Sequence, residues 1–478
     1  MSARSRAIAV LLPLVGCAVG PDFQRPVAPT DQRFTVEPTP PNMAQSNRLA
    51  ADWWHLLHCP ALDTLVVDAW KGNPGLESAE ATLRKSQDAL RAGYGIFSPQ
   101  LDGSAGASRQ QSSPQRFGLN TPSTVFNLFT LSATVSYALD IWGGQRRTVE
   151  GLRAQMEAQR DQVLGTRLML AGNVVNTVIA SAAYQAEIDA TRQLLALQED
   201  QVRLAETQAK AGTIPYANVL GLKSQLALTR TTLPPLEQKI DQARHLLATL
   251  LGRAPGQWSP SPIALGDLTL PDAIPLSLPS QLVRQRPDIL IAEEQLHGAT
   301  AQIGVATSAL LPSLTLTGTL GANNTSLGDL FSSSSLFWSL GAGLAQPLFH
   351  GGTLWYQRKE ALDARDAALA NYRQTVLAAF AQVADALRGL THDADALAAQ
   401  KEALAAADQS VKLVEINYES GLANYLQVLT ADTQYLQAKM GYIEVQAQQL
   451  QDTVALFVAL GGGWWNEDHK VAANAERR

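Results

Sequence analysis

The sequence predicts a mixed α/β membrane protein with a duplicated half, in which each half contributes a two-strand membrane β-hairpin and long coiled-coil helices. Two observations indicate this fold class: an internal repeat that spans most of the 478 residues, and a change from helical to strand periodicity inside each half. A further observation concerns two stretches of about 65 residues, 145–210 and 353–419. Both lack proline and consist mostly of residues that are common in helices.

The chain begins with a pattern typical of a secretory signal. A positively charged start precedes a short apolar run, Ile8–Val15, which cannot span a bilayer. The run ends in Leu14–Cys17, which resembles a bacterial lipobox, so we expect residues 1–16 to be the signal peptide and Cys17 to carry diacylglycerol and palmitate. The alternative is an ordinary signal peptide with a chance cysteine. Ala18, rather than aspartate, follows the cysteine, which favours the outer membrane as the destination.

Composition excludes several functional classes. The net charge of −6, with no basic patch, disfavours a nucleic-acid partner. Two cysteines provide no disulfide framework, and His55, His58 and Cys59 have poor spacing for a metal site. No nucleophile–base pair stands out, so we expect no enzyme, no metal and no cofactor beyond the covalent lipid. After the signal no run approaches about 20 apolar residues, so any crossing of a membrane must use strands.

The internal repeat places matching motifs about 210 residues apart, in the same order. The matched pairs are Asn73-Pro74 with Arg286-Pro287, Ser98-Pro99 with Leu311-Pro312, Gly143-Gly144 with Gly351-Gly352, Ala211-Gly212 with Ser420-Gly421, and Leu251-Gly252 with Leu460-Gly461. We therefore divide the mature chain into an N-terminal segment at 17–60, a first repeat at 61–272, a second repeat at 273–462 and a C-terminal tail at 463–478.

Each repeat ends in a predicted helical hairpin, at about 145–251 and about 353–460. A helix of about 65 residues is roughly 100 Å long, which implies a coiled-coil or tubular assembly. Gly212 and Gly421 are expected to end the long helices and form the tip turns, because glycine accepts the left-handed conformation. Alanine-rich faces favour lateral packing in a sheet of helices, with a plain coiled coil as the alternative.

Between the helices the apolar residues alternate with polar ones, which indicates strands. We expect the strands at about 98–108 and 128–141 in the first repeat, and at about 312–322 and 335–347 in the second. Each is about ten residues long, as a tilted strand needs to cross a bilayer. Trp142, Trp338 and Phe349 lie near strand ends, which suits an interfacial aromatic belt, although ordinary packing is the alternative.

The strand count predicts an oligomer. One chain supplies four strands, whereas a closed membrane barrel needs about eight or more, and open sheet edges are not tolerated in lipid. Two, three or four chains would pool eight, twelve or sixteen strands, and an eight-stranded barrel is filled by side chains. A water-filled channel therefore requires a trimer or a larger ring.

Several motifs together resemble the outer membrane factor family, the efflux ducts similar to OprM, NodT and TolC. They are Cys17–Phe23 with Arg25-Pro26, Trp53-Trp54, Arg286–Ile289 with Ala292-Glu293, Leu311–Ser313, Gln346–Phe349, and Tyr418–Gly421 with Asn424–Leu426. The resemblance implies a homotrimer that forms a 12-stranded barrel and a periplasmic α-helical tunnel, with residues 17–60 packed on a collar. It also implies passive export of drugs and toxic compounds, with an inner-membrane pump and a periplasmic adaptor that docks on the tips at Gly212 and Gly421.

The same resemblance locates a periplasmic aperture just after the Asn-Tyr-Leu segment, at Leu426, Thr430 and Thr433. Relatives often carry an acidic residue where Thr430 stands, whereas the acid here is Asp432. A shift of two residues rotates a helical side chain by about 200°, so an acidic constriction is in question. We favour Leu426 as an apolar plug; the alternative is that all four residues only pack the hairpin.

Three other functions stay open at this point. Metal-ion efflux and type I protein secretion use similar ducts, although the five methionines and seven histidines form no cluster on the long helices, which argues against soft-metal export. A structural helical lipoprotein of the cell envelope would share the helices. It would not need four strands with alternating faces.

Overall fold

The computed structural model describes residues 18–30, 33–37, 43–45, 49–113, 118, 122–271 and 274–466. Contacts divide the chain into two compact units. Unit 1 contains the N-terminal segment up to Arg25, Arg84–Ala158 and Ala292–Tyr372, and unit 2 contains Pro26–Leu83, Gln159–Ile291 and the segment from Arg373 onward. Each unit draws on both sequence repeats, so the division into units runs across the repeats.

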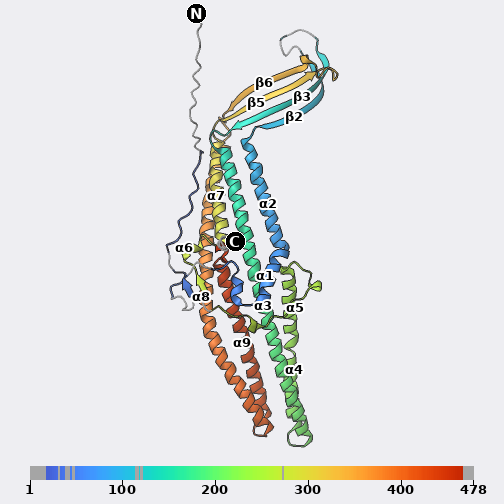
Figure 1. The fold of residues 1–478 in the computed structure, drawn as a ribbon, viewed down its shortest axis with the longest axis vertical. Coiled ribbons are helices and arrows are strands. Elements are labelled where there is room, and N and C mark those ends of the chain that lie inside the picture. Colours follow the sequence, from blue (N-terminus) through green and yellow to red (C-terminus); the bar gives the residue numbers. More distant parts are fainter. Residues whose placement is uncertain are drawn as a thin grey trace, which may run out of the picture. The chain divides into compact units, whose positions relative to one another are not determined.

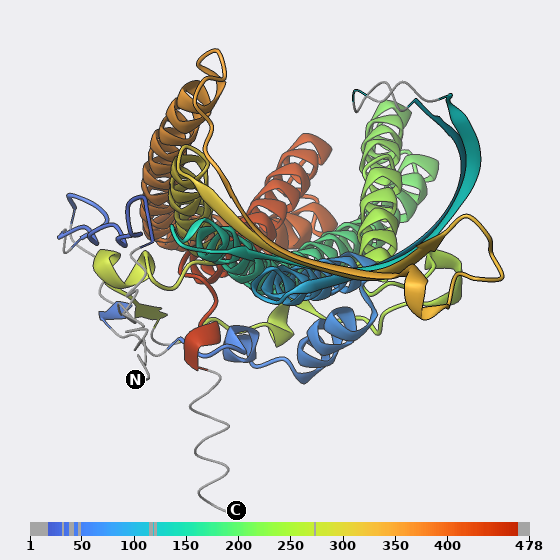
Figure 2. The ribbon, with the colours of Figure 1, turned by 90° about the horizontal axis from the view of Figure 1, so that it is seen from above.

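Unit 1 contains a curved antiparallel sheet of four strands in the order β2-β3-β5-β6 (Figures 1 and 2). The strands are β2 (Gln100–Ser112), β3 (Thr124–Leu139), β5 (Ser313–Asn324) and β6 (Leu336–Ala345). The β2–β3 and β5–β6 hairpins come from different repeats and are joined through β3 and β5. This confirms the prediction of one two-strand hairpin in each half.

The first hairpin is longer than the alternation predicts. The β2–β3 ladder continues to the Ser112–Thr124 pair, beyond the expected strand ends at 108 and 128. Polar side chains such as Arg109 and Asn127 interrupt the apolar pattern there, but the backbone hydrogen bonds continue past them. In this hairpin, sequence periodicity thus marks only the half-apolar part of the strands.

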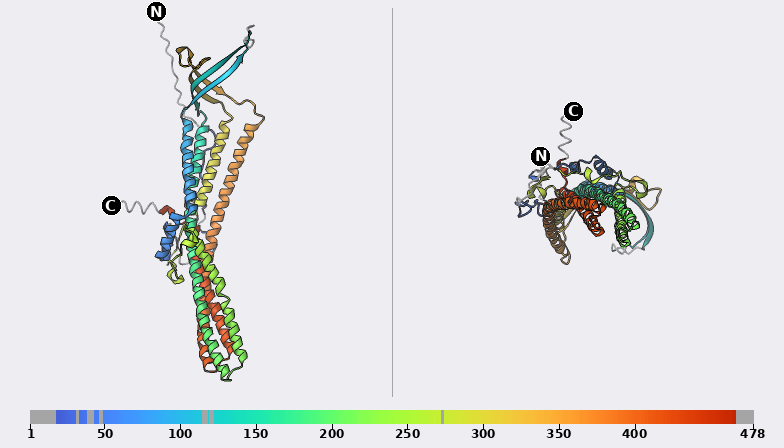
Figure 3. Two further views of the ribbon diagram at one scale, coloured as in Figure 1. Left: turned by 90° about the vertical axis from the view of Figure 1, so that its right-hand side faces the viewer. Right: turned by 90° about the horizontal axis from the view of Figure 1, so that it is seen from below.

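Four helices run side by side in one layer in unit 1 (Figure 3). They are α2 (Pro74–Tyr94), α3 (Gly144–Lys210), α7 (Pro287–Ser308) and α8 (Thr353–Glu419). All four helices have residues in both units. Arg153 of α3 donates to Tyr94 of α2, and Arg358 of α8 donates to Thr307 of α7. Between these pairs, Gly298 of α7 faces Ala154 of α3. The small residue at this contact fits the predicted lateral packing.

Unit 2 contains the return helices of the two hairpins. The first return is broken into α4 (Tyr216–Arg230) and α5 (Leu233–Leu250), whereas the second, α9 (Tyr425–Ala459), is continuous. Pro234 and Pro235 open α5, and a proline inside a helix removes a hydrogen bond and clashes with the preceding turn. The return arm of the predicted hairpin at about 145–251 is therefore two helices, whereas that of the hairpin at about 353–460 is one.

The remaining elements of unit 2 are short. They are α1 (Pro60–Gly72), α6 (Pro279–Leu282), the parallel pair β1 (Met43–Gln45) and β4 (Ile274–Leu276), and the 3-10 helices η1 (Trp53–Leu57), η4 (Pro255–Gln257), η5 (Leu265–Asp267) and η7 (Trp464–Asn466). Among the described residues, the 3-10 helices η2 (Gly95–Phe97) and η6 (Ser333–Ser335) belong to unit 1. An aromatic cluster joins η1 and α1 to α9. Trp53 is buried against Trp54 and Phe457, and Trp54 packs edge-on against Trp70.

Helix α3 contains an 18-residue window that is apolar enough to span a membrane by length and composition. Half of this window is buried inside the protein, and a core helix meets the same criterion. Of the described helices, α3 alone passes this test.

Candidate functional site

One face of the sheet is apolar. Because directly paired residues of neighbouring strands lie on the same face, the row Leu101–Val135–Gly318–Leu340 continues across all four strands. Large apolar side chains on this face are exposed in the protomer, namely Leu101, Leu131, Val135, Leu316, Leu320, Leu336, Trp338, Leu340 and Leu344. An uncovered apolar surface of this kind is suited to contact with lipid.

The opposite face is rich in hydroxyl groups. The neighbouring row is Asp102–Thr134–Thr319–Ser339. The hydroxyls of Thr134 and Thr319 lie 3.2 Å apart, and those of Ser104 and Ser132 lie 2.8 Å apart, both at hydrogen-bonding distance. The sheet therefore offers one face to lipid and the other to water.

The sheet has two open edges. Among the described residues, β2 pairs only with β3, and β6 pairs only with β5. Unpaired backbone groups cost several kcal/mol each inside a bilayer. A membrane-embedded sheet of this form needs neighbouring chains to cover its edges.

The predicted interfacial aromatics lie near both ends of the strands. Trp142, after β3, donates its indole N–H to the carbonyl of Pro312 at 2.8 Å. Trp338 pairs with Leu320 on the apolar face near the loop end of β6, and it is 73% exposed. Phe349, which follows β6, is 88% exposed. Their membrane depth stays a prediction.

The predicted lipidation site, Cys17, lies outside the described residues. The segment that follows it is fastened in unit 1. Val19 donates its backbone N–H to the carbonyl of Trp142 at 2.8 Å, and Arg147 donates to the carboxylate of Asp22 at 2.6 Å. Gly20 has φ +92°, and a Cβ there would lie 2.6 Å from the Cα of Gly304. The chain just beyond Cys17 is thus fixed beside the end of β3.

A second set of contacts holds the same segment on α7. The ring of Phe23 stacks on the ring of His297 at 4.4 Å, and Arg25 forms an ion pair with the buried Glu293. His297 lies between Glu294, at 3.2 Å, and Glu150, at 3.0 Å. Hydrogen bonding to these carboxylates, to Glu294 above all, raises the pKa of His297 in spite of its partial burial.

The tip glycines occupy equivalent helix-ending turns. Gly212 and Gly421 have φ values of +76° and +74°. Thr213 and Leu422, the residues after them, donate backbone hydrogen bonds back to the carbonyls of Gln208 and Asn417. The structure therefore places both predicted glycines in the turns that join the paired helices. Adaptor docking at these turns stays a prediction.

The four predicted aperture residues separate into two groups on α9. Leu426 is 60% exposed, and Thr430 and Thr433 are exposed on the same helix. The two threonine hydroxyls donate to the carbonyls of the residues four positions earlier. Asp432 is only 1% exposed, so in this conformation its carboxylate lies inside the protomer.

Asp432 is surrounded by amide side chains of α3. Gln198 donates to its carboxylate at 3.4 Å, and Gln201 also donates a hydrogen bond to it. Burial raises the pKa of Asp432 to about 6, and the nearby Glu415 acts in the same direction. The rotation of the acid to the opposite helix face, which the two-residue shift predicts, explains this burial.

Sequence reasoning missed two interactions of charged residues in unit 2. Arg286 is buried and donates to the carbonyl of Ala459, at the end of α9. Asp393 hydrogen-bonds to Asp452, and burial, followed by this contact, raises the pKa of Asp393 to about 6. Arg286 belongs to a motif visible in the sequence, whereas nothing in the spacing of the two aspartates links them.

The histidines near Cys59 have separate partners. His55 contacts Asp52 and Asp63 at 3.3 and 3.5 Å, and His58 contacts the hydroxyl of Thr269 at 3.1 Å. Cys59 is a buried free thiol. The described part of the chain contains no group of three or more His, Cys, Asp or Glu residues that could hold a metal ion.

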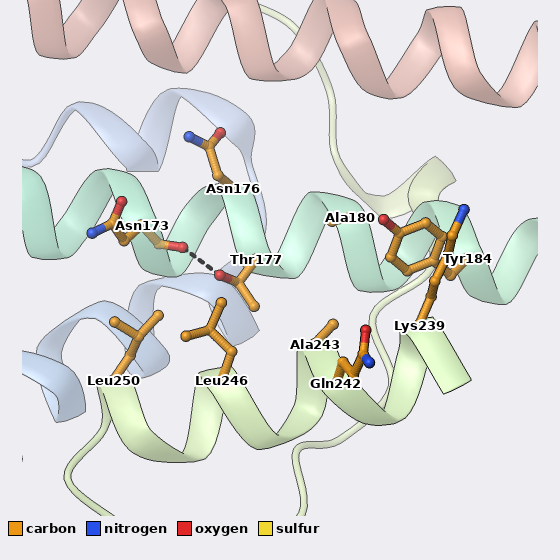
Figure 4. Close-up of a pocket in the computed structure, with 10 residues that line it drawn as sticks. All are labelled: Asn173, Asn176, Thr177, Ala180, Tyr184, Lys239, Gln242, Ala243, Leu246 and Leu250. Carbon is orange, nitrogen blue, oxygen red and sulfur yellow. Dashed lines mark hydrogen bonds between the residues drawn. The ribbon is translucent and has the colours of Figure 1, made fainter. Parts of the chain in front are cut away.

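A groove of about 510 Å³ runs between α3 and α5 in unit 2 (Figure 4). Thr177 donates to the carbonyl of Asn173 at 2.7 Å, and the ammonium of Lys239 lies 5.3 Å from the centre of the Tyr184 ring. Leu246 and other apolar side chains complete the lining. The lining residues are both polar and apolar, and they recur at helical spacing on α3 and α5. The groove is therefore the line along which these two helices pack, and we assign it no ligand.

The two-faced sheet with open edges, carried on long paired helices, defines a subunit of an oligomeric membrane channel. The sequence model for outer membrane efflux proteins matches residues 65–253 and 278–462. The chain therefore belongs to the outer membrane efflux protein family. Channels of this family are trimers that work with an adaptor and an inner-membrane pump, and they are not enzymes.

Individual relatives agree with this assignment. The pyoverdine export outer membrane protein OpmQ of Pseudomonas aeruginosa is 30% identical over 425 residues, which cover 88% of this chain and 89% of that protein. The cation efflux system protein CusC of Escherichia coli is 27% identical, with 95% and 97% covered. The solved structure of the outer-membrane channel OprN superposes with a TM-score of 0.87 at 28% identity, covering 94% of this chain and all of that one. The chain is an outer-membrane protein.

Proposed function

We propose that three copies of this chain form a passive exit duct through which an inner-membrane pump and its adaptor export small toxic molecules. The observation that carries the proposal is the four-stranded sheet with one apolar face, one hydroxyl face and two open edges. Three such sheets close into a twelve-stranded barrel with a water-filled interior. Membership of the efflux family supports the tripartite arrangement.

The conduit is tested by deletion of the gene, followed by uptake and susceptibility measurements with detergents, antibiotics, aromatic compounds and metal ions. We expect intracellular accumulation of organic compounds to rise in the deletion strain and to return to normal on complementation. Unchanged accumulation of every compound contradicts an efflux role. A rise confined to metal ions contradicts the small-molecule assignment.

Metal-ion efflux is the second candidate, and the relative named as a cation efflux protein is the observation that favours it. A duct that only conducts needs no metal ligands of its own. The susceptibility profile therefore separates the two, because copper or silver sensitivity without sensitivity to organic compounds identifies a metal duct. Protein secretion is checked by comparing the culture supernatants of the two strains.

We further propose that Cys17 carries the lipid anchor. The contacts of Val19 and Asp22 beside Trp142 support this, because they hold the anchor segment close to the end of a membrane strand. A named relative from Salmonella typhimurium, the probable outer membrane lipoprotein SilC, supports lipidation in the family. The adaptor is proposed to bind at the tip turns around Gly212 and Gly421.

A further inference from the structure

The four strands carry two charged residues, Asp102 and Arg109, both on β2. Register places them on opposite faces. Asp102 pairs with Thr134 in the hydroxyl row, whereas Arg109 pairs with Asn127 in the apolar set near the loop end. Arg109 donates to the side-chain oxygen of Asn127 at 3.4 Å. Only Asp102, among the residues of these strands, gives the hydroxyl face a charge.

No strand residue neutralises this carboxylate from the same face. Its row continues through Thr134, Thr319 and Ser339, all uncharged. The hydroxyls of Thr134 and Thr319 lie within hydrogen-bonding distance of each other, and the Asp102 side chain is exposed. An exposed carboxylate among neutral hydroxyl groups creates a local negative potential that attracts cations and repels anions.

We infer that Asp102 makes the barrel interior prefer cations, and that cationic and neutral solutes pass this section more easily than anions. The inference rests on the proposed trimeric channel, in which the hydroxyl face lines the water path. Three copies then place three carboxylates at the same depth, forming a ring within a wall of serine and threonine side chains. Asp102 is thus a selectivity-determining residue of the barrel, separate from the helix tips.

The expected effect is modest and depends on salt. At a separation of about 10 Å in water, each carboxylate changes the energy of a permeating ion by a fraction of the thermal scale, and salt at about 0.1 M screens it further. Summed over three copies, cations are favoured about twofold and anions disfavoured about twofold, so we expect about a fivefold change in the ratio of cation to anion permeability. At about 1 M salt the screening length falls to about 3 Å, so the effect should vanish.

The test measures reversal potentials of the full-length channel in planar bilayers under a potassium chloride gradient at low salt. We expect Asp102→Asn to lower the cation-to-anion permeability ratio about fivefold. Arg109→Gln is the charge-removing control on the other face. The double variant Asp102→Asn with Thr319→Asp moves the carboxylate along the same row, and it should restore the ratio.

The outcomes distinguish this inference from the proposed function. If the wild-type protein forms no conducting channels, the duct proposal itself fails. If it conducts and Asp102→Asn leaves the permeability ratio unchanged, the selectivity role of Asp102 is overturned while the duct proposal stands. A drop in Asp102→Asn that the relocated carboxylate does not restore also contradicts the ring, because charge on that row is what the inference requires.

Discussion

Gln198 of α3 donates a hydrogen bond to the buried carboxylate of Asp432 of α9 at 3.4 Å. The contact links the outgoing helix of the first hairpin with the return helix of the second. It also gives unit 2 a buried acid with a raised pKa.

Asp432→Asn should stabilise the protein at neutral pH. Burial raises the pKa of Asp432 from 3.8 to about 6. Between about pH 4 and 6 the carboxyl is therefore protonated in the folded protein but ionised in the unfolded chain. The free energy of unfolding therefore falls as pH rises through this window and then stays constant. We expect the variant to gain up to about 3 kcal/mol above pH 7 and little near pH 4.

This prediction is checked by the midpoint of thermal loss of helical circular dichroism in detergent, for wild type and variant, from pH 4 to 8. Asp408→Asn, at an exposed ion pair on α8, is the control. A difference in midpoint that does not grow with pH contradicts the buried, proton-linked role of Asp432.

Leu426→Ser should raise single-channel conductance in planar bilayers. Leu426 projects from the first turn of α9 and is 60% exposed, so replacing its apolar side chain removes a barrier to water if it lines the aperture. Leu413→Ser on α8, at a leucine that is 61% exposed, is the matched control and should leave conductance unchanged. Equal conductance of wild type and Leu426→Ser removes Leu426 from the constriction.

Gly421→Ala should destabilise the tip of the second hairpin by about 1 kcal/mol, because alanine must adopt φ near +74° there. Gly151→Ala in α3, where no atom lies within 4 Å of the added Cβ, should instead be neutral or stabilising. Amide hydrogen exchange around residues 417–425 measures the local effect. Unaltered exchange in Gly421→Ala argues against the left-handed turn.

Cys17→Ser should abolish incorporation of radioactive palmitate, whereas Cys59→Ser should not, because Cys59 is buried. Labelling that persists in Cys17→Ser refutes lipidation at this residue. Labelling lost in both variants indicates a general failure of export, which the amount of protein in the outer-membrane fraction identifies.

The parts of the fold that depend on local pattern could be predicted from the sequence. The alternation of Leu131 to Leu139 identified β3, and Gly212 and Gly421 marked the helix ends, because periodicity and helix capping act over a few residues. Pro234 and Pro235 are also a local signal, because two adjacent prolines predict the start of a new helix at α5.

Other features depend on contacts between residues far apart in the sequence. The burial of Asp432 follows from its packing against Gln198, 234 positions earlier. The fastening of Val19 beside Trp142 depends on where β3 ends in space. Neither feature has a local signal in the sequence, because each depends on a contact with a segment that is remote in the chain. The position of Asp102 could be predicted only in part. It lies on the predicted first strand, but the register with β3 is needed to show which face of the sheet it occupies.

The interruption between α4 and α5 has a mechanical consequence. Thr231 and Thr232 separate two rigid rods in the first hairpin, whereas α9 runs unbroken through the second. We therefore expect the first hairpin to bend more easily than the second under a load at its tip, because the two prolines that open α5 remove helical hydrogen bonds at this point. In the proposed trimer, three more flexible and three stiffer hairpins would then alternate around the ring.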